Sequence, residues 1–218
     1  MKNLNFLCTL ILIMGMISIS SAQSKINGQG RTVKETIDLS EIHSIGLGIA
    51  ANIYLTQSNT QEIVIEGQKN IIDNIKKNVK DGSWNIEFSK RANNYNDLKI
   101  YISLKTIKSL AIGGAGNIIG ESSFNNLGDL DISIGGAGKV RLSGDARVVD
   151  INIGGSGKVD MSDLRAEKCS VSIAGNGDCQ VDVNEKLNVS IAGMGNVRYS
   201  GNPQVSSSIA GMGKVKKM

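Results

Sequence analysis

The chain has 218 residues, of which 40% are hydrophobic, 20% are charged and only 4% are aromatic, and it contains 26 glycines and a single proline. So much glycine without a collagen period favours a fold with many tight turns over a helical one. One histidine and three cysteines are too few for most zinc, haem and iron–sulfur centres, and a net charge of +4 is too small to indicate a nucleic-acid partner.

The first 22 residues have the features of a signal peptide. Lys2 supplies a positive charge, residues 6–19 form an apolar stretch, and Ser20-Ser21-Ala22 places small residues before a cleavage site. The apolar stretch is shorter than the ~20 residues of a membrane span, so an uncleaved anchor is the weaker alternative. We predict export to the periplasm, the cell surface or the medium, with no integral membrane span after cleavage.

The first half of the mature chain, residues 23–218, is the less regular one. Apolar residues alternate in residues 45–55, 63–65, 84–88 and 98–104, which is typical of strands. Residues 70–80 instead have helical spacing, with Asn70 as an expected N-cap and Asp81-Gly82 as a stop. We predict one short helix among the first strands, and we interpret residues 45–55 as a degenerate copy of the repeat described next.

The second half contains six copies of one pattern, in which Gly/Ala-Gly-x-Gly separates two alternating apolar segments. Counted from the isoleucine that precedes each turn, the copies are spaced by 18 to 22 residues. The copies span residues 110–118, 132–140, 151–159, 171–179, 189–197 and 207–215. Repetition at this period is the signature of a stacked architecture.

Each copy is predicted to form a strand, a tight turn and a second strand. Alternation places Leu130, Ile132 and Ile134 on one face and Asp131 and Ser133 on the other. At least one glycine in each turn is expected to need positive φ, where a side chain would clash. Because the copies keep one phase, the chain is predicted to be all-β: a single-domain parallel β-helix (β-solenoid) over residues 23–218, with its clearest repeats in 108–218.

Like residues are expected to form columns along the solenoid axis. Two inward columns are Leu130, Val149, Cys169, Leu187, Val205 and Val140, Val159, Cys179, Val197, Val215. Two outward columns carry small side chains, all polar except that of Ala111: Ser109, Asp131, Asp150, Ser170, Asn188, Ser206 and Ala111, Ser133, Asn152, Ser172, Ser190, Ser208. The outward columns form a solvated face, a sugar-binding face or a self-packing face.

The face beyond the turn has mixed charge. Its basic residues, interleaved with Asp160 and Asp178, are Lys139, Arg141, Lys158, Arg198, Lys214 and Lys216. Mixed signs suit solubility better than phosphate recognition.

The sequence does not match known catalytic and ligand-binding motifs at the residues that these motifs require. The turn at residues 135–140 resembles a phosphate loop, but Val140 stands where a Ser or Thr would bind magnesium. A calcium-binding nonapeptide repeat would need an aspartate at Val159 and a period about half as long. His43 is the only histidine, and it lies outside the repeats. We therefore expect no catalytic, cofactor-binding or metal-binding residues.

Cys169 and Cys179 are the two cysteines of the mature chain, and both are predicted to point inward in one rung. An oxidising compartment allows a disulfide if their Cα atoms lie within about 7 Å. Otherwise both are buried small hydrophobic residues. Both alternatives remain open on the sequence.

The C-terminal rung is expected to be uncovered. Ser207 replaces an inward aliphatic residue, and the strand after the last turn is only Val215-Lys216-Lys217-Met218. The lysines would partly protect its edge from pairing. Met194 and Met212 lie at the tips of the last two turns. These features favour weak homo-oligomerisation through the C-terminal rungs.

Several segments resemble a known bacterial family. They are Asn52-Ile-Tyr-Leu-Thr-Gln57, Ile65-Glu-Gly67, Val79-Lys-Asp-Gly82 and the repeated Gly-x-Gly turns, whereas Ala50-Ala51-Asn52 stands where the family tends to have Gly-Ile-Asn. Over most of residues 35–218 the chain resembles the family called "putative auto-transporter adhesin, head GIN domain". The resemblance implies a pectin-lyase-like β-helix and a role in adhesion, without established catalytic residues.

These observations give three functional hypotheses. The first is a secreted, non-enzymatic β-solenoid that acts as an adhesin-like or envelope-associated binding module for a glycan or another cell-surface ligand. The second is a carbohydrate-active, pectin-lyase-like enzyme, although no acidic or basic cluster stands out on either face. The third is a purely structural envelope protein.

Overall fold

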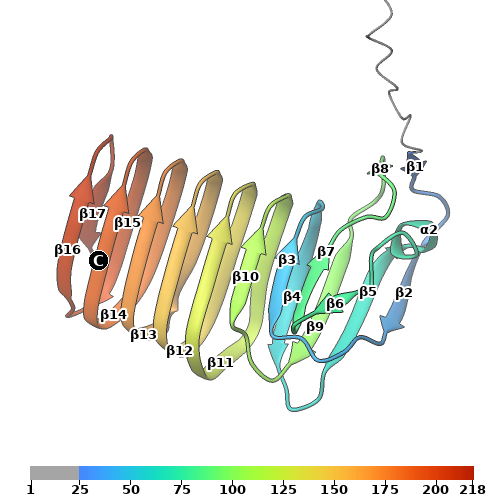
Figure 1. Ribbon diagram of the computed structural model, residues 1–218, viewed down its shortest axis with the longest axis horizontal. Helices are drawn as coiled ribbons and strands as arrows, with labels where there is room; N and C mark the ends of the chain where they lie inside the picture. The colour runs from blue at the N-terminus through green and yellow to red at the C-terminus, as the bar shows by residue number, and fades with distance from the viewer. Residues whose placement is uncertain (1–24) are drawn as a thin grey trace, which may run out of the picture.

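The computed structural model describes residues 25–218, so the predicted signal peptide lies outside the described residues. Parallel strands stack side by side along the long axis of the molecule, with the glycine turns forming one edge (Figure 1). The elements are β1 (Ile26–Asn27), β2 (Thr32–Ile37), β3 (Ser44–Leu47), β4 (Ala51–Gln57), β5 (Glu62–Gln68), α2 (Lys69–Ile72), β6 (Val79–Lys80), β7 (Ser83–Ile86), β8 (Ala92–Asn93), β9 (Lys99–Leu104), β10 (Ser109–Ile112), β11 (Ala115–Ile134), β12 (Ala137–Ile153), β13 (Ser156–Ile173), β14 (Asn176–Ile191), β15 (Met194–Gly201), β16 (Gln204–Ile209) and β17 (Lys214–Lys217). The predicted all-β parallel solenoid is confirmed.

Each long strand from β11 to β14 makes one full coil, or rung, of the solenoid, from one glycine turn to the next. It leaves a glycine turn, crosses one face, bends, and crosses the second face to the next turn (Figure 1). Neighbouring rungs pair in parallel and in register at the turns, whereas register shifts fall near the bends, for example between Arg141 and Ser143. The bends therefore absorb the differences in repeat length, and the turns stay aligned.

The predicted inward columns are confirmed. In the first column Leu130 pairs with Val149, Val149 with Cys169, Cys169 with Leu187, and Leu187 with Val205. The column that runs from Val140 to Val215 pairs in the same way. All members are buried except those of the last rung, which no further rung covers. Aliphatic stacking between the two faces thus forms one continuous core.

The turn glycines are required for a reason other than the one expected. The prediction that each turn contains a glycine with positive φ is wrong for five of the six turns. Among the turn glycines of the repeats, only Gly116 has a positive φ. Instead, a methyl group on Gly136 would lie 2.0 Å from the carbonyl oxygen of Gly114 in the rung below. The first turn position faces open space, as at Gly135, and this explains why Ala174 can stand there later.

The N-terminal half begins the solenoid and closes its end. β3 and β4 pair in parallel with β10 and β11, which confirms the degenerate rung at residues 45–55. Beyond them β5 pairs antiparallel with β9 and with β2, and Ile71 and Ile72 of α2 are buried against this end (Figure 1). The antiparallel strands and the helix cover the core that a further parallel rung would otherwise cover.

The helix is shorter than residues 70–80. It spans only Lys69–Ile72, because Ile75 forms a bridge with Phe88 and β6 pairs with β7 in a hairpin. Asp81 and Gly82, at φ 50° and 69°, form the hairpin turn rather than a helix stop. Asn70 is not the N-cap, which is Gln68. The Asn70 side chain instead holds the segment before β2, accepting a hydrogen bond from the Gln29 amide and donating to the Asn27 carbonyl.

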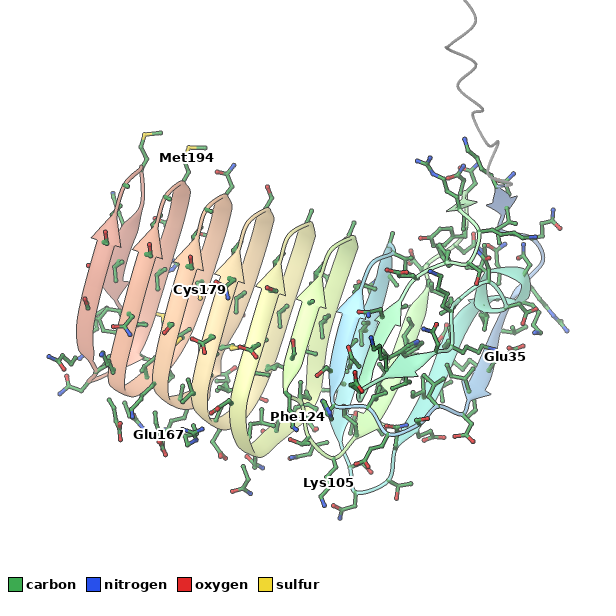
Figure 2. The ribbon with its side chains drawn as sticks, in the orientation of Figure 1. Glu35, Lys105, Phe124, Glu167, Cys179 and Met194 are labelled. Carbon is green, nitrogen blue, oxygen red and sulfur yellow. The ribbon has the colours of Figure 1, made fainter. Side chains whose placement is uncertain are left out.

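Cys169 and Cys179 are free and buried, which is the second of the two alternatives left open. Figure 2 shows Cys179 in the core between the two faces. Burial raises the pKa of Cys169 to about 12 and also raises that of Cys179. Both side chains therefore act as neutral hydrophobic residues at physiological pH.

We expect Gly136→Ala to lower the free energy of unfolding by about 2 kcal/mol or more, because the new methyl group forces the turn away from the rung below. Gly135→Ala is the matched control and should be nearly neutral, because nothing lies within 4 Å of its methyl position. Urea unfolding followed by the fluorescence of Trp84, the single tryptophan, measures both. Equal midpoints for the two variants would contradict this account of the turns.

We expect the two thiols to resist a bulky maleimide in the folded protein and to react in urea. Because burial raises their pKa values, stability is retained below the ordinary thiol pKa of 9.0 and declines as the pH rises from there toward about 12. Unfolding measured between pH 8 and pH 11 in wild type and in a Cys169→Val/Cys179→Val variant isolates this effect from tyrosine titration. An identical pH dependence in both proteins would refute it.

Candidate functional site

The two outward polar columns lie where alternation predicted them. Register pairs join Ser109 to Asp131, Asp131 to Asp150 and onward to Ser206, and they join Ala111 to Ser133 and onward to Ser208. We call these twelve residues the polar ladder. Its side chains project from strands about 4.8 Å apart, so like groups repeat at that spacing along the axis.

The polar side chains of the ladder have no partners within the described part of the chain. Among residues 25–218, none of their hydroxyl, amide or carboxylate groups takes part in a hydrogen bond or an ion pair. The opposite face differs: Ser200 donates to Asp182 at 2.8 Å, and Asn196 donates to Asp178 at 3.1 Å. The ladder therefore presents its polar groups to solvent or to a ligand.

A shallow groove follows the C-terminal part of the ladder. It has a volume of about 270 Å³ and runs from Asp150 and Asn152 to Ser206 and Ser208. Apart from Asp150, its outward groups are neutral hydroxyls and amides, which both donate and accept hydrogen bonds. Such a surface suits a ligand with many hydroxyl groups better than an ion.

The polar ladder contains two carboxylates. Asp131 and Asp150 are register neighbours on one open face. A glycosidase holds the bond that breaks between two carboxyl groups, whereas the groove described above is lined by Asp150 and not by Asp131. No group of three or more His, Cys, Asp or Glu between residues 25 and 218 could hold a metal ion. His43 contacts Ser44, with 3.0 Å between Nδ1 and Oγ, and lies outside the ladder.

The face beyond the turn contains ion pairs between its own side chains. Lys139 lies 3.6 Å from Asp160, and Arg141 lies 3.7 Å from Asp163. Burial alone would raise the pKa of Asp160, but hydrogen bonds from Ser162 and the charges of Lys139 and Arg141 outweigh it, so the pKa is lowered. These contacts leave fewer groups free for a ligand than the ladder does.

Sequence reasoning missed a cluster on β2, β4, β5 and β9. Tyr54 and Tyr101 stack at 5.1 Å, Lys34 lies over the Tyr101 ring, and the Tyr101 hydroxyl donates to Glu66 at 3.2 Å. Tyr54 and Tyr101 are partners in the parallel pairing of β4 with β9. Lys34 and Glu66 come from β2 and β5, whose pairing is antiparallel, so the repeat phase could not predict their contacts. The alternation of each tyrosine between inward residues was the one available signal.

No helix in the described part of the chain is long and apolar enough to span a membrane.

Known proteins share this architecture. A solved structure from Bacteroides fragilis, named a "putative adhesin", is 26% identical, has a TM-score of 0.73, and matches 88% of this chain and 100% of its own. Two further solved structures share the fold. A "putative adhesin" from Parabacteroides merdae is 17% identical, has a TM-score of 0.54, and matches 89% of this chain and 99% of its own. A "putative lipid binding protein" from Parabacteroides distasonis is 21% identical, has a TM-score of 0.55, and matches 89% of this chain and 100% of its own.

No curated protein matches the chain. The family model described as "putative auto-transporter adhesin, head GIN domain" matches residues 41–203, which include the degenerate rung, antiparallel β5 and β9, and most of the repeats. On that match the chain belongs to the family described as "putative auto-transporter adhesin, head GIN domain".

Proposed function

We propose that the protein is an exported, non-enzymatic binding module, adhesin-like, and that it contacts a glycan at a cell surface through the polar ladder. In this proposal residues 1–22 are removed on export, and residues 23–218 work without a cofactor in the periplasm, on the cell surface or in the medium. Membership of an adhesin family supports the general role. The observation that carries the proposal is the ladder of unpartnered polar groups on one face.

A repeated face of this kind binds through many weak contacts. Each rung contributes a pair of small polar side chains, such as Ser172 with Ser170 or Ser190 with Asn188. One hydrogen bond to a sugar hydroxyl contributes only about 0.5–1.5 kcal/mol. An extended glycan that spans several rungs adds such contacts with little further entropy cost, which is the advantage of multivalent binding.

The ladder is tested with two matched double variants. Ser172→Lys/Ser190→Lys places bulk and charge on the ladder, and we expect it to lower binding on a glycan array at least tenfold. Gln180→Lys/Asn196→Lys makes the same change of charge on the opposite face and should leave binding intact. Unchanged melting temperatures would show that both variants fold. A wild-type protein that binds no glycan, or equal loss in both variants, would contradict the proposal.

We also propose a weak homodimer through the last rung. The exposed large hydrophobic residues of the described chain all lie in the last two rungs: Met194, Val205, Ile209, Met212 and Met218. Figure 2 shows Met194 at the outer end of its turn. β16 pairs only with β14, so its outer edge is unpaired.

The sequence of β16 is complementary to itself in an antiparallel pair. With Ser207 opposite Ser207 of a second copy, Val205 faces Ile209, and the two half-exposed inward residues cover each other. The lysines of β17 would then face the lysines of the second β17, which weakens the pair.

We expect light scattering at high protein concentration to show a dimer fraction that increases with salt, because salt screens the lysine repulsion. Val205→Lys should abolish the dimer, and Met194→Ser/Met212→Ser should reduce it. Wild-type protein that stays strictly monomeric across this salt range would refute the dimer.

A further inference from the structure

A separate pocket opens near the N-terminal end, beside the glycine turns. It has a volume of about 440 Å³ and lies between the loop that joins β8 to β9 and the turns that precede β4 and β11. Its volume is within the range of small-molecule sites, about 300–1,000 Å³. We call it the asparagine pocket, because its polar lining is Asn52, Asn94, Asn96 and Asp97, next to Tyr95 and Leu98. None of its lining residues belongs to the polar ladder.

The wall of this pocket is held in place before any ligand arrives. The Tyr95 ring packs edge-on against Phe88 at 5.4 Å, and its hydroxyl donates to the Ala50 carbonyl at 3.0 Å. The backbone amide of Asn96 donates to the side-chain oxygen of Gln68, a residue only 7% exposed. The loop therefore loses little freedom when a ligand binds, which favours affinity.

The polar groups that line the pocket are free to form hydrogen bonds with a ligand. Among the described residues, the side chains of Asn94, Asn96 and Asp97 take part in no hydrogen bond or ion pair. The Asn52 oxygen accepts a hydrogen bond from Asn117 at 2.8 Å, which leaves the Asn52 amide group as a donor. Amides that donate and accept, together with one carboxylate that accepts, can satisfy adjacent hydroxyl groups that also do both.

The same chemistry disfavours other ligands. The lining contains a carboxylate but no cationic side chain, so a phosphate or carboxylate ligand would be repelled. Calcium takes 6–8 oxygen ligands, about half of them commonly carboxylate, whereas this lining offers a single carboxylate. The small walls formed by Ala50, Ala51 and Ala115 leave room for the apolar face of a ring.

We propose that the asparagine pocket binds one neutral sugar residue, with Asp97 and Asn96 holding adjacent hydroxyls and Asn52 donating a further hydrogen bond. This site goes beyond the polar ladder and does not depend on it. It would recognise a single terminal residue, whereas the ladder would contact an extended chain.

The test uses residues 23–218 and the methyl glycosides of glucose, galactose, mannose and N-acetylglucosamine, one at a time. We expect saturation-transfer NMR to detect millimolar binding of at least one glycoside, unchanged by EDTA. Asn96→Ala/Asp97→Ala should weaken that binding at least about tenfold, because it removes the hydrogen bonds that the charged Asp97 carboxylate and the neutral Asn96 amide make to the sugar. Asn59→Ala/Asp38→Ala removes the same two residue types at exposed positions outside both the pocket and the polar ladder, and it should leave the affinity unchanged.

Three results would overturn the proposal: no transfer to any of the four glycosides, a requirement for calcium, or equal loss of binding in the pocket variant and in the Asn59→Ala/Asp38→Ala control. Equal melting temperatures are expected for both variants, because all four side chains are unpartnered. The glycan array with Ser172→Lys/Ser190→Lys reports on the ladder separately, so failure of one site is distinguishable from failure of the other.

Discussion

The close approach of one turn to the next is the constraint on which the rest of the structure depends. At the second glycine of each turn, the carbonyl oxygens of the rung below lie too close to allow any side chain, as at Gly136 and Gly155. A larger residue there would push neighbouring rungs beyond strand spacing on the turn edge. Because the turns align, the two strands that leave each turn align as well. The aliphatic core columns and the polar ladder both follow from this alignment.

The two ends of the solenoid differ in whether the core of the last rung is covered. At the N-terminal end, antiparallel β2 and β5 and the buried isoleucines of α2 cover the core. At the C-terminal end, Val205 and Ile209 stay 37% and 42% exposed, and lysines flank the unpaired edge. Charge on an edge strand discourages non-specific pairing without covering apolar surface. The C-terminal end therefore remains the place where another chain could add to the sheet.

The two faces differ in how their polar groups are used. On the face beyond the turn, pairs such as Lys139 with Asp160 satisfy one another. On the ladder face, small hydroxyl and amide groups have no internal partner among the described residues, and at the N-terminal end the asparagine pocket repeats this property in a concave form. Groups without internal partners lose only water when a ligand binds. This difference is the basis on which we propose a binding role for the ladder and the pocket.

The sequence by itself determined the stacked fold, the members of the core columns and the members of the polar ladder, because repeat phase and strand alternation are local properties that need no distant partner. It did not determine the true role of the glycines, since a contact between Gly136 and Gly114 exists only once the rungs are stacked. The shortened helix, the tyrosine cluster of Tyr54 and Tyr101, and the asparagine pocket were also decided by the tertiary structure. The helix is shortened by the antiparallel pairing of β6 with β7, and the pocket depends on a loop outside the repeat. Tyr54 and Tyr101 are partners in the parallel pairing of β4 with β9, but Lys34 and Glu66 reach Tyr101 from antiparallel strands, where segments far apart in the chain meet without a shared phase.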